Sequence, residues 1–156
     1  MSDRLEQVSG QAVSRETMDR LAAFVSLLTA AAREQNLVSA STIESMWDRH
    51  VVDSAQLARF EPHRGASWAD VGSGAGLPGL VVACLVAGPV TLIEPRRLRA
   101  EFLGRAVEAL GLANRVRVEQ ARVERVRGRF DVITARAVAP LRKLLEISHH
   151  LSTGKT

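Results

Sequence analysis

The stretch DVGSGAGLPG (70–79) constrains what this chain can fold into more than any other part of the sequence. It contains four glycines, follows the apolar run SWADV (67–71), and leads into GLPGLVVACLVA (76–87), whose composition favours a helix. A glycine-rich turn between a strand and a helix leaves N–H groups free at the helix N-terminus and lets a ligand approach the main chain. The sequence therefore predicts a strand–loop–helix unit whose loop holds a ligand.

Strand-like and helix-like segments alternate from this point to the end of the chain. Apolar runs that predict strands lie at 67–71, 90–94, 115–119 and 130–134. Helices are predicted at 76–87, 96–111 and 139–151, with a shorter one between the last two strands. Strands separated by helices of this length pair in parallel through right-handed crossovers. We therefore expect an α/β fold with a doubly wound, mainly parallel sheet and helices on both faces.

The first 64 residues have a different pattern. Apolar side chains recur at helical spacing over 14–35, with Ser14 as the predicted N-cap. A second helix is predicted to start near Ser41 or Thr42 and to run to Phe60. Because 156 residues suit one domain, we expect residues 1–64 to form a helical extension packed on an α/β core of residues 65–156.

The composition indicates a protein of the cytoplasm. Cys84 is the only cysteine, so no internal disulfide can form. The N-terminus MSDRLEQVSG has no signal-peptide core. The longest apolar stretch, 77–93, is interrupted by proline and glycine and is too short to span a bilayer as one helix, so we expect no membrane contact. The four histidines do not have the spacing of a metal site, and none is predicted.

The charge is distributed unevenly along the chain. Residues 1–95 contain 7 Arg and Lys against 11 Asp and Glu, whereas residues 96–156 contain 14 against 6. A basic half predicts a polyanionic partner such as nucleic acid, although a solvated charged surface gives the same pattern.

The glycine spacing narrows the choice of ligand. A phosphate-binding P-loop is excluded because no lysine follows the glycines, and Leu77 stands where a dinucleotide-binding loop has its third glycine. The form D-x-G-x-G-x-G, which begins at Asp70, resembles motif I of the class I S-adenosylmethionine-dependent methyltransferases. In that motif the acidic residue positions the loop or the cofactor's amino group. Glu94, at the end of the next strand, is placed to accept hydrogen bonds from both ribose hydroxyls of a nucleoside. Such a contact would suit S-adenosylmethionine and NAD equally.

A closer resemblance covers most of the chain. NL (36–37), MWDRHVVDS (46–54), DVGSGAGLPGL (70–80), ARVE (121–124) and FDVITARAVAPL (130–141) occur in the order and spacing of the RsmG family, also called glucose-inhibited division protein B. The resemblance implies a class I methyltransferase (Rossmann-like) fold with S-adenosylmethionine as cofactor. It implies methylation of N7 of a guanine in the 530 loop of 16S ribosomal RNA, with the RNA or the 30S subunit as partner.

The resemblance also assigns site residues. We expect the cofactor to be bound by Asp70, Gly72, Gly74, Gly76, Leu77, Glu94, Val123, Glu124 and Arg136. Val123 and Glu124 match the pair beside the adenine, and Arg136 matches an arginine at the cofactor site. No catalytic residue is expected, because guanine N7 carries a lone pair and no proton, so no general base is needed. Arginines expected to contact RNA phosphates are Arg96, Arg97, Arg99, Arg115 and Arg117.

The end of the sequence departs from the family pattern. Further strands are expected after the helix at 139–151, so the core is predicted to be C-terminally truncated. The strand at 130–134 then has an exposed edge, through which an otherwise monomeric chain can self-associate. Two alternatives stay open from the residues: an inactive relative that binds cofactor or RNA, and an NAD-dependent oxidoreductase.

Overall fold

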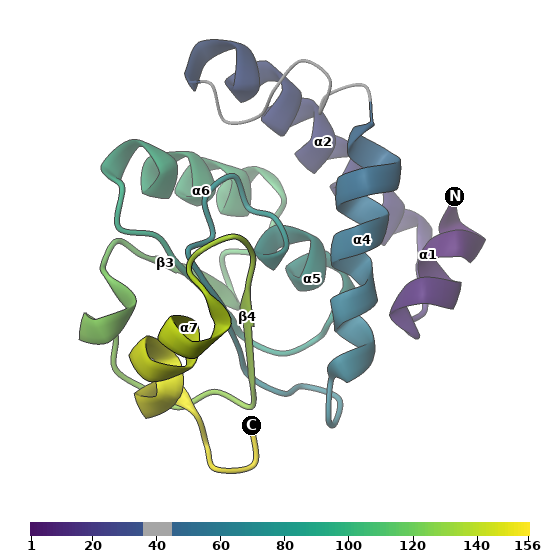
Figure 1. Ribbon diagram of the computed structural model, residues 1–156. Helices are drawn as coiled ribbons and strands as arrows, with labels where there is room; N and C mark the ends of the chain where they lie inside the picture. The colour runs from purple at the N-terminus through teal and green to yellow at the C-terminus, as the bar shows by residue number, and fades with distance from the viewer. Residues whose placement is uncertain (36–44) are drawn as a thin grey trace.

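The computed structural model describes residues 1–35 and 45–156 and contains one parallel sheet. Its four strands lie in the order β3-β2-β1-β4 (Figure 1). At the carboxyl end of β1, Val71 pairs with Ile93 on one side and with Ala135 on the other. The predicted parallel α/β sheet is confirmed, with β4 beginning two residues later than expected. The strands are β1 (Trp68–Val71), β2 (Val90–Ile93), β3 (Val116–Glu119) and β4 (Val132–Ala135).

Helices cover both faces of the sheet, as the doubly wound fold predicts (Figure 1). On one face, α5 (Gly79–Leu85) and α6 (Arg97–Ala109) share a core with Trp68 and Leu92. On the other, α7 (Leu141–Ser148) and the short helical turns η3 (Val123–Arg125) and η4 (His149–Leu151) pack on Val71 and Ile93. Alternation along β1, β2 and β4 supplies apolar side chains for both faces, whereas β3 supplies Val116 and Val118 to the first face only.

All three predicted helices are shorter than their sequence patterns suggest. Pro78 caps α5, and Val86 is already extended with a φ of −91° and a ψ of 158°. Gly111 follows α6 with a φ of +66° and ends it as expected. The segment predicted as a helix over 139–151 begins at Leu141 and changes to a 3-10 turn at His149.

The N-terminal helices pack on α5 and extend the core of that face. The predicted helix over 14–35 is α2 (Arg15–Gln35), and the Ser14 hydroxyl accepts the Thr17 N–H as an N-cap. A further helix, α1 (Ser2–Ser9), was not predicted, because few apolar residues mark its buried side. The start predicted near 41–42 lies outside the described residues. The rest of that segment has three helical forms instead of one, namely η1 (Met46–Val51), α4 (Val52–Ala55) and η2 (Gln56–Phe60).

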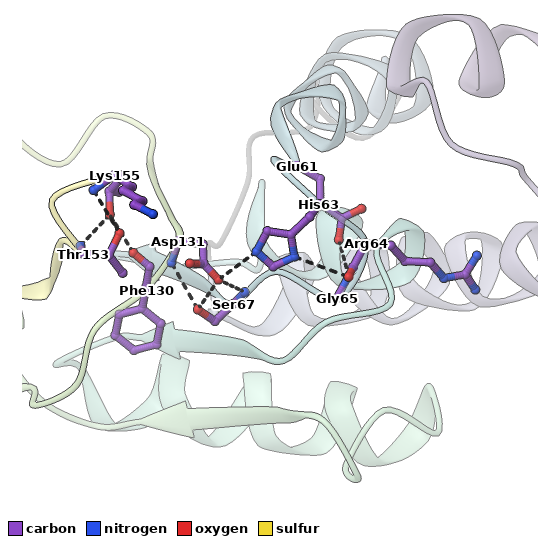
Figure 2. A network of polar contacts seen from close by, with 10 residues as sticks. Glu61, His63, Arg64, Gly65, Ser67, Phe130, Asp131, Thr153 and Lys155 are labelled. Carbon is purple, nitrogen blue, oxygen red and sulfur yellow. Dashed lines mark hydrogen bonds and ion pairs between the residues drawn. The ribbon is translucent and has the colours of Figure 1, made fainter.

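A polar network joins the amino ends of the neighbouring strands β1 and β4 (Figure 2). Ser67, just before β1, donates its N–H and its hydroxyl to Asp131 Oδ2, just before β4, at 2.8 and 3.0 Å. The C-terminal residues join here too, because the Phe130 N–H donates to the Leu151 carbonyl and Thr156 Oγ1 donates to the Phe130 carbonyl. The outer edge of β4 itself has no strand partner within the described residues.

The start of α5 lies unusually close to the sheet. Gly79 is the first residue of that helix, and a Cβ atom there would collide with Asp70 Oδ2 and with Leu92 Cδ2. Only a glycine therefore lets α5 begin directly above the carboxyl end of β1. Within the described residues, no helix combines the length and the apolar character needed to cross a membrane.

Two helical glycines give a matched test of this packing. Gly79→Ala should lower the free energy of unfolding by about 1–3 kcal/mol, because the added methyl overpacks a filled site. Gly104→Ala, in α6 with open space around its Cβ position, should raise that free energy by about 0.5–1 kcal/mol through helix propensity. Urea unfolding curves measure both changes. Equal stability of the Gly79→Ala variant and the wild type would contradict the described contact.

Candidate functional site

A crevice of about 680 Å³ opens at the carboxyl ends of the strands. Segments at the ends of all four strands line it: 71–75 and Leu77 at β1, 93–96 at β2, 122–124 after β3 and 136–138 after β4. The neighbouring strands β1 and β4 lead into helices on opposite faces of the sheet, α5 after β1 and α7 after β4, and ligands of doubly wound folds bind at such a switch point. The volume lies in the usual range for small-molecule sites, roughly 300–1,000 Å³.

The glycine-rich loop forms the floor of this crevice in a conformation that side chains disfavour. Gly72 and Gly74 have φ angles of +68° and +53°. A Cβ at Gly72 would lie 2.6 Å from Val138 Cγ2, so the loop after β4 packs directly on the loop after β1. Gly76, with a φ of +90°, does not line the crevice, because its Cβ position faces Leu80. The structure thus gives Gly76 a packing role, and its contact with the cofactor stays a prediction.

Glu94 ties the glycine-rich loop to the next strand. The Gly74 N–H donates to Glu94 Oε2 at 2.9 Å, and the Arg96 N–H donates to Oε1 at 3.0 Å. Only 3% of the residue is exposed, yet it lines the crevice. Each carboxylate oxygen accepts more than one hydrogen bond, so both oxygens keep capacity for ligand hydroxyls.

Asp70 lies beneath the loop and outside the crevice lining. Its Oδ1 accepts the Thr134 hydroxyl of β4 at 2.8 Å, whereas Oδ2 faces the backbone at Gly79 and has no hydrogen-bond partner among the described residues. Burial raises the pKa of Asp70 to about 6, against the opposing effect of the Thr134 and Ser73 hydrogen bonds. This position agrees with the loop-positioning role expected for Asp70, and its contact with the cofactor stays a prediction.

The remaining predicted cofactor residues do meet at the crevice. Leu77, Val123, Glu124 and Arg136 all line it. Arg136 also reaches the N-terminal helices, because its Nη1 donates to His50 Nδ1 at 3.3 Å. Burial and then the Arg136 charge lower the pKa of His50, which keeps the ring neutral and Nδ1 free to accept.

The five arginines expected to contact RNA are divided by the fold. Arg96 and Arg99 line the crevice, and Arg97 forms an ion pair with Glu101 on α6. Arg115 is half-buried at the opposite end of the sheet, where it donates to the Ala83 and Gly88 carbonyls. The guanidinium is thus used at the end of α5, away from the crevice, and its contact with RNA stays a prediction.

Arg117 is exposed but has partners within the protein. It donates to the Thr91 hydroxyl at 3.1 Å and forms an ion pair with Glu119 at 3.5 Å. It does not line the crevice with Arg96 and Arg99, and its contact with RNA stays a prediction.

Some residues of the crevice were missed from the sequence. Arg122 and Val138 lie inside the motifs ARVE and FDVITARAVAPL, so those motifs could have indicated that both residues line the crevice. Ile147 of α7 carries no such signal, because its place depends on how that helix packs over the sheet. The missed lining residues include Ser73, Ala75, Pro95, Arg122, Val138 and Ile147.

Comparison with known proteins identifies the family. A family model described as "GidB: rRNA small subunit methyltransferase G" matches residues 17–156. The chain belongs to this family. Its relatives named ribosomal RNA small subunit methyltransferase G include one from Zymomonas mobilis, 44% identical over 153 residues, and one from Novosphingobium aromaticivorans, 48% identical over 161 residues. These matches cover 92% and 96% of this chain but 68% and 70% of the relatives, so the chain spans about two thirds of their length.

Solved structures confirm the class I methyltransferase fold. A methyltransferase from Geobacter sulfurreducens matches with a TM-score of 0.62 at 21% identity, over 83% of this chain and 65% of that one. A SAM-dependent methyltransferase from Thiobacillus denitrificans, solved with S-adenosyl-L-homocysteine, matches with a TM-score of 0.53 at 19% identity, over 81% and 49% of the two chains. The family match favours a methyltransferase over the NAD-dependent oxidoreductase held open from the residues.

The burial of Asp70 predicts a specific dependence of stability on pH. Its pKa is raised from 3.8 to about 6, so the folded state binds more protons than the unfolded state in that window. The contribution of Asp70 to stability should therefore fall by about 3 kcal/mol as the pH rises from about 4 to about 7.

Asp70→Asn removes this titration and should gain stability relative to the wild type across the same window. Unfolding free energies from urea curves at several pH values measure the difference between the two proteins. A difference that stays constant with pH would contradict the raised pKa.

Proposed function

We propose that this chain binds S-adenosylmethionine in the crevice and methylates N7 of a guanine in the 530 loop of 16S ribosomal RNA. The observation that supports this most directly is the convergence of the glycine-rich loop, Glu94 and segment 122–124 on one cavity at the switch point of the sheet. The family match supplies the reaction class, since its members are named for methylation of small-subunit ribosomal RNA.

The residues present suit this cofactor. Glu94 keeps two carboxylate oxygens with spare acceptor capacity, which suits the two ribose hydroxyls of a nucleoside. Val123, which is buried, and Glu124 would flank the adenine. The amino-acid end would lie against the backbone of the glycine-rich loop, where Gly74 has no side chain and both Gly72 and Gly74 line the crevice. We infer these roles from position and chemistry together.

For this reaction the protein has to align guanine N7 with the methyl group and exclude water from the site. The bound cofactor supplies an electrophilic methyl group on a sulfonium sulfur. Guanine N7 has an in-plane lone pair, so no group of the chain has to remove a proton. Orientation alone contributes several kcal/mol in favourable cases, of order 7–11 in the best intramolecular examples. The chain provides it through a loop that is fixed at two points: the Ser73 hydroxyl donates to the Asp70 carbonyl, and the Gly74 N–H donates to Glu94.

Electrostatics favour an RNA substrate at this crevice. Arg96, Arg99, Arg122 and Arg136 line it, against the carboxylates of Glu94 and Glu124. Arginines near a site attract phosphates, and their contribution weakens as salt rises. We propose Arg96 and Arg99 as phosphate contacts and the cytoplasm as the compartment, with naked 16S RNA or the assembled 30S particle as the substrate.

Substitution of the proposed ribose ligand tests cofactor binding. Glu94→Gln should weaken S-adenosylmethionine binding about 10- to 100-fold, because charge-assisted hydrogen bonds are lost. Isothermal titration calorimetry measures the affinity, and circular dichroism checks that the variant is folded. Glu108→Gln makes the same charge change on the exposed side of α6 and should bind like the wild type. Equal affinity of both variants would remove Glu94 from the site.

Methyl transfer tests the reaction itself. Incubation with isotope-labelled S-adenosylmethionine and small-subunit RNA or 30S particles from cells that lack this enzyme should yield 7-methylguanosine in the 530 loop. Mass spectrometry of nuclease fragments locates the modified base. Cofactor binding without transfer to either substrate would select the inactive relative, and transfer to another base or position would overturn the assignment of the target.

A further inference from the structure

A second hollow of about 280 Å³ lies beside the cofactor crevice, between the N-terminal helices and the carboxyl end of β4. Asp53, Ser54, Leu57 and Phe60 line it from the helical side, and Pro78 and Arg136 from the core. Arg136 also lines the cofactor crevice, so the two spaces meet at its side chain. The hollow is smaller than usual small-molecule sites, whose volume starts at roughly 300 Å³.

The order of the strands places this hollow at one end of the proposed cofactor site. Adenine, ribose and amino-acid positions are proposed above β3, β2 and β1, and β4 follows β1 in the sheet. The hollow continues the same line beyond the glycine-rich loop, because Ala135 and Arg136 at the end of β4 form its inner wall. It therefore lies on the side where the reactive part of the cofactor is expected.

We propose that this hollow receives the target guanine, flipped out of the RNA, and that Asp53 and Arg136 distinguish it from the other bases. This inference rests on the proposed function, because it assigns a pocket to the acceptor of that reaction. Extruding a base from its stack costs a few kcal/mol, which contacts to the base edge and face must offset.

The two charged groups match the edge of guanine. Guanine presents N7 and O6 as acceptors side by side, followed by the N1–H and N2–H donors. If N7 faces the cofactor crevice, O6 lies next to the boundary, where Arg136 donates. The N1–H and N2–H groups then point away from that boundary, toward the Asp53 carboxylate, which accepts both. Adenine has an acceptor at N1 and would face Asp53 with an unpaired lone pair.

Two other features of the hollow suit a planar base. Phe60 is 66% exposed, and an exposed aromatic ring next to a polar pocket offers a stacking surface. Ser54 is 2% exposed, and its hydroxyl has no hydrogen-bond partner within the described residues. Buried hydroxyls are normally paired, so this one is available to a ligand.

Arg136 is held in place from the helical side. Its contact with His50 Nδ1 joins the end of β4 to the segment that carries Asp53, three residues further along the chain. His50 is thus a positioning residue, and it links two groups that would otherwise depend on separate elements.

Nucleotide binding tests the pocket without requiring methyl transfer. Guanosine, inosine and adenosine 5′-monophosphates are titrated into the full chain while aromatic resonances assigned to Phe60 are followed by NMR. S-adenosyl-L-homocysteine is kept at saturating concentration so that the cofactor crevice is filled. We expect guanosine monophosphate to shift the Phe60 resonances, inosine monophosphate to bind more weakly because it lacks the N2 amino group, and adenosine monophosphate to leave them unchanged.

Asp53→Asn should weaken guanosine monophosphate binding at least about tenfold and remove its advantage over inosine monophosphate. Asp48→Asn is the matched control, because Asp48 lies on the same helical segment, pairs with Arg4 and lines neither space. Phe60→Leu should weaken both nucleotides equally, since stacking does not read the base edge.

The outcomes separate this inference from the proposed function. The proposal that this hollow binds guanine would be overturned if the Phe60 resonances did not change. It would also be overturned if the Asp53→Asn variant kept the preference for guanine, even if the wild type methylates RNA. A preference for guanine that depends on Asp53 would support the proposed base pocket. Failure of methyl transfer or of S-adenosyl-L-homocysteine binding in the same preparation would count against the proposed function alone.

Discussion

The burial of Asp70 directly beneath the glycine-rich loop is the constraint that organises the crevice. A carboxylate with one unpartnered oxygen is unfavourable in a protein interior, so the surrounding structure must be specific enough to keep it there. The Thr134 hydroxyl bonds Asp70 across the β1–β4 pair, the two strands between which the topology reverses. Gly79 completes the arrangement, since any larger residue would push α5 away from the carboxylate.

Glu94 combines a structural task with a proposed binding task. Its two oxygens accept N–H groups from Gly74 and Arg96, which fixes the loop after β1 relative to the chain after β2. The same oxygens lie where the ribose of a nucleoside is proposed to bind. A ligand that adds hydrogen bonds there meets a carboxylate already oriented by the backbone, which reduces the entropy lost on binding.

Arg136 occupies the boundary between two neighbouring spaces, one assigned to the cofactor and one to the base. Its bond to His50 connects the α/β core with the N-terminal helices. The helical extension therefore does more than cover α5, because it supplies one wall of the hollow beside the site. Specificity for the base is proposed to come from that extension, whereas cofactor binding belongs to the core.

Neighbouring residues in the chain account for most of the local structure. The strand-and-helix alternation, the N-cap at Ser14 and the helix end at Gly111 follow from side chains close together in the chain, and so does the glycine-rich loop before α5. The residues expected at the cofactor site were also found in one crevice, apart from Asp70 and Gly76. Motifs predicted them because each directly follows a strand, and the carboxyl ends of parallel strands meet at one edge.

The contacts of charged side chains with groups far away in the sequence became visible in the three-dimensional fold alone. The sequence predicts Arg115 as an RNA contact. In the structure, it lies next to the end of α5 and donates to the Ala83 and Gly88 carbonyls. The sequence predicts Asp70 at the cofactor site. In the structure, its side chain is buried and accepts a hydrogen bond from Thr134, 64 residues further along the chain. The pairing of Arg136 with His50 spans 86 residues. Such contacts depend on strand order and helix packing, which no local pattern encodes.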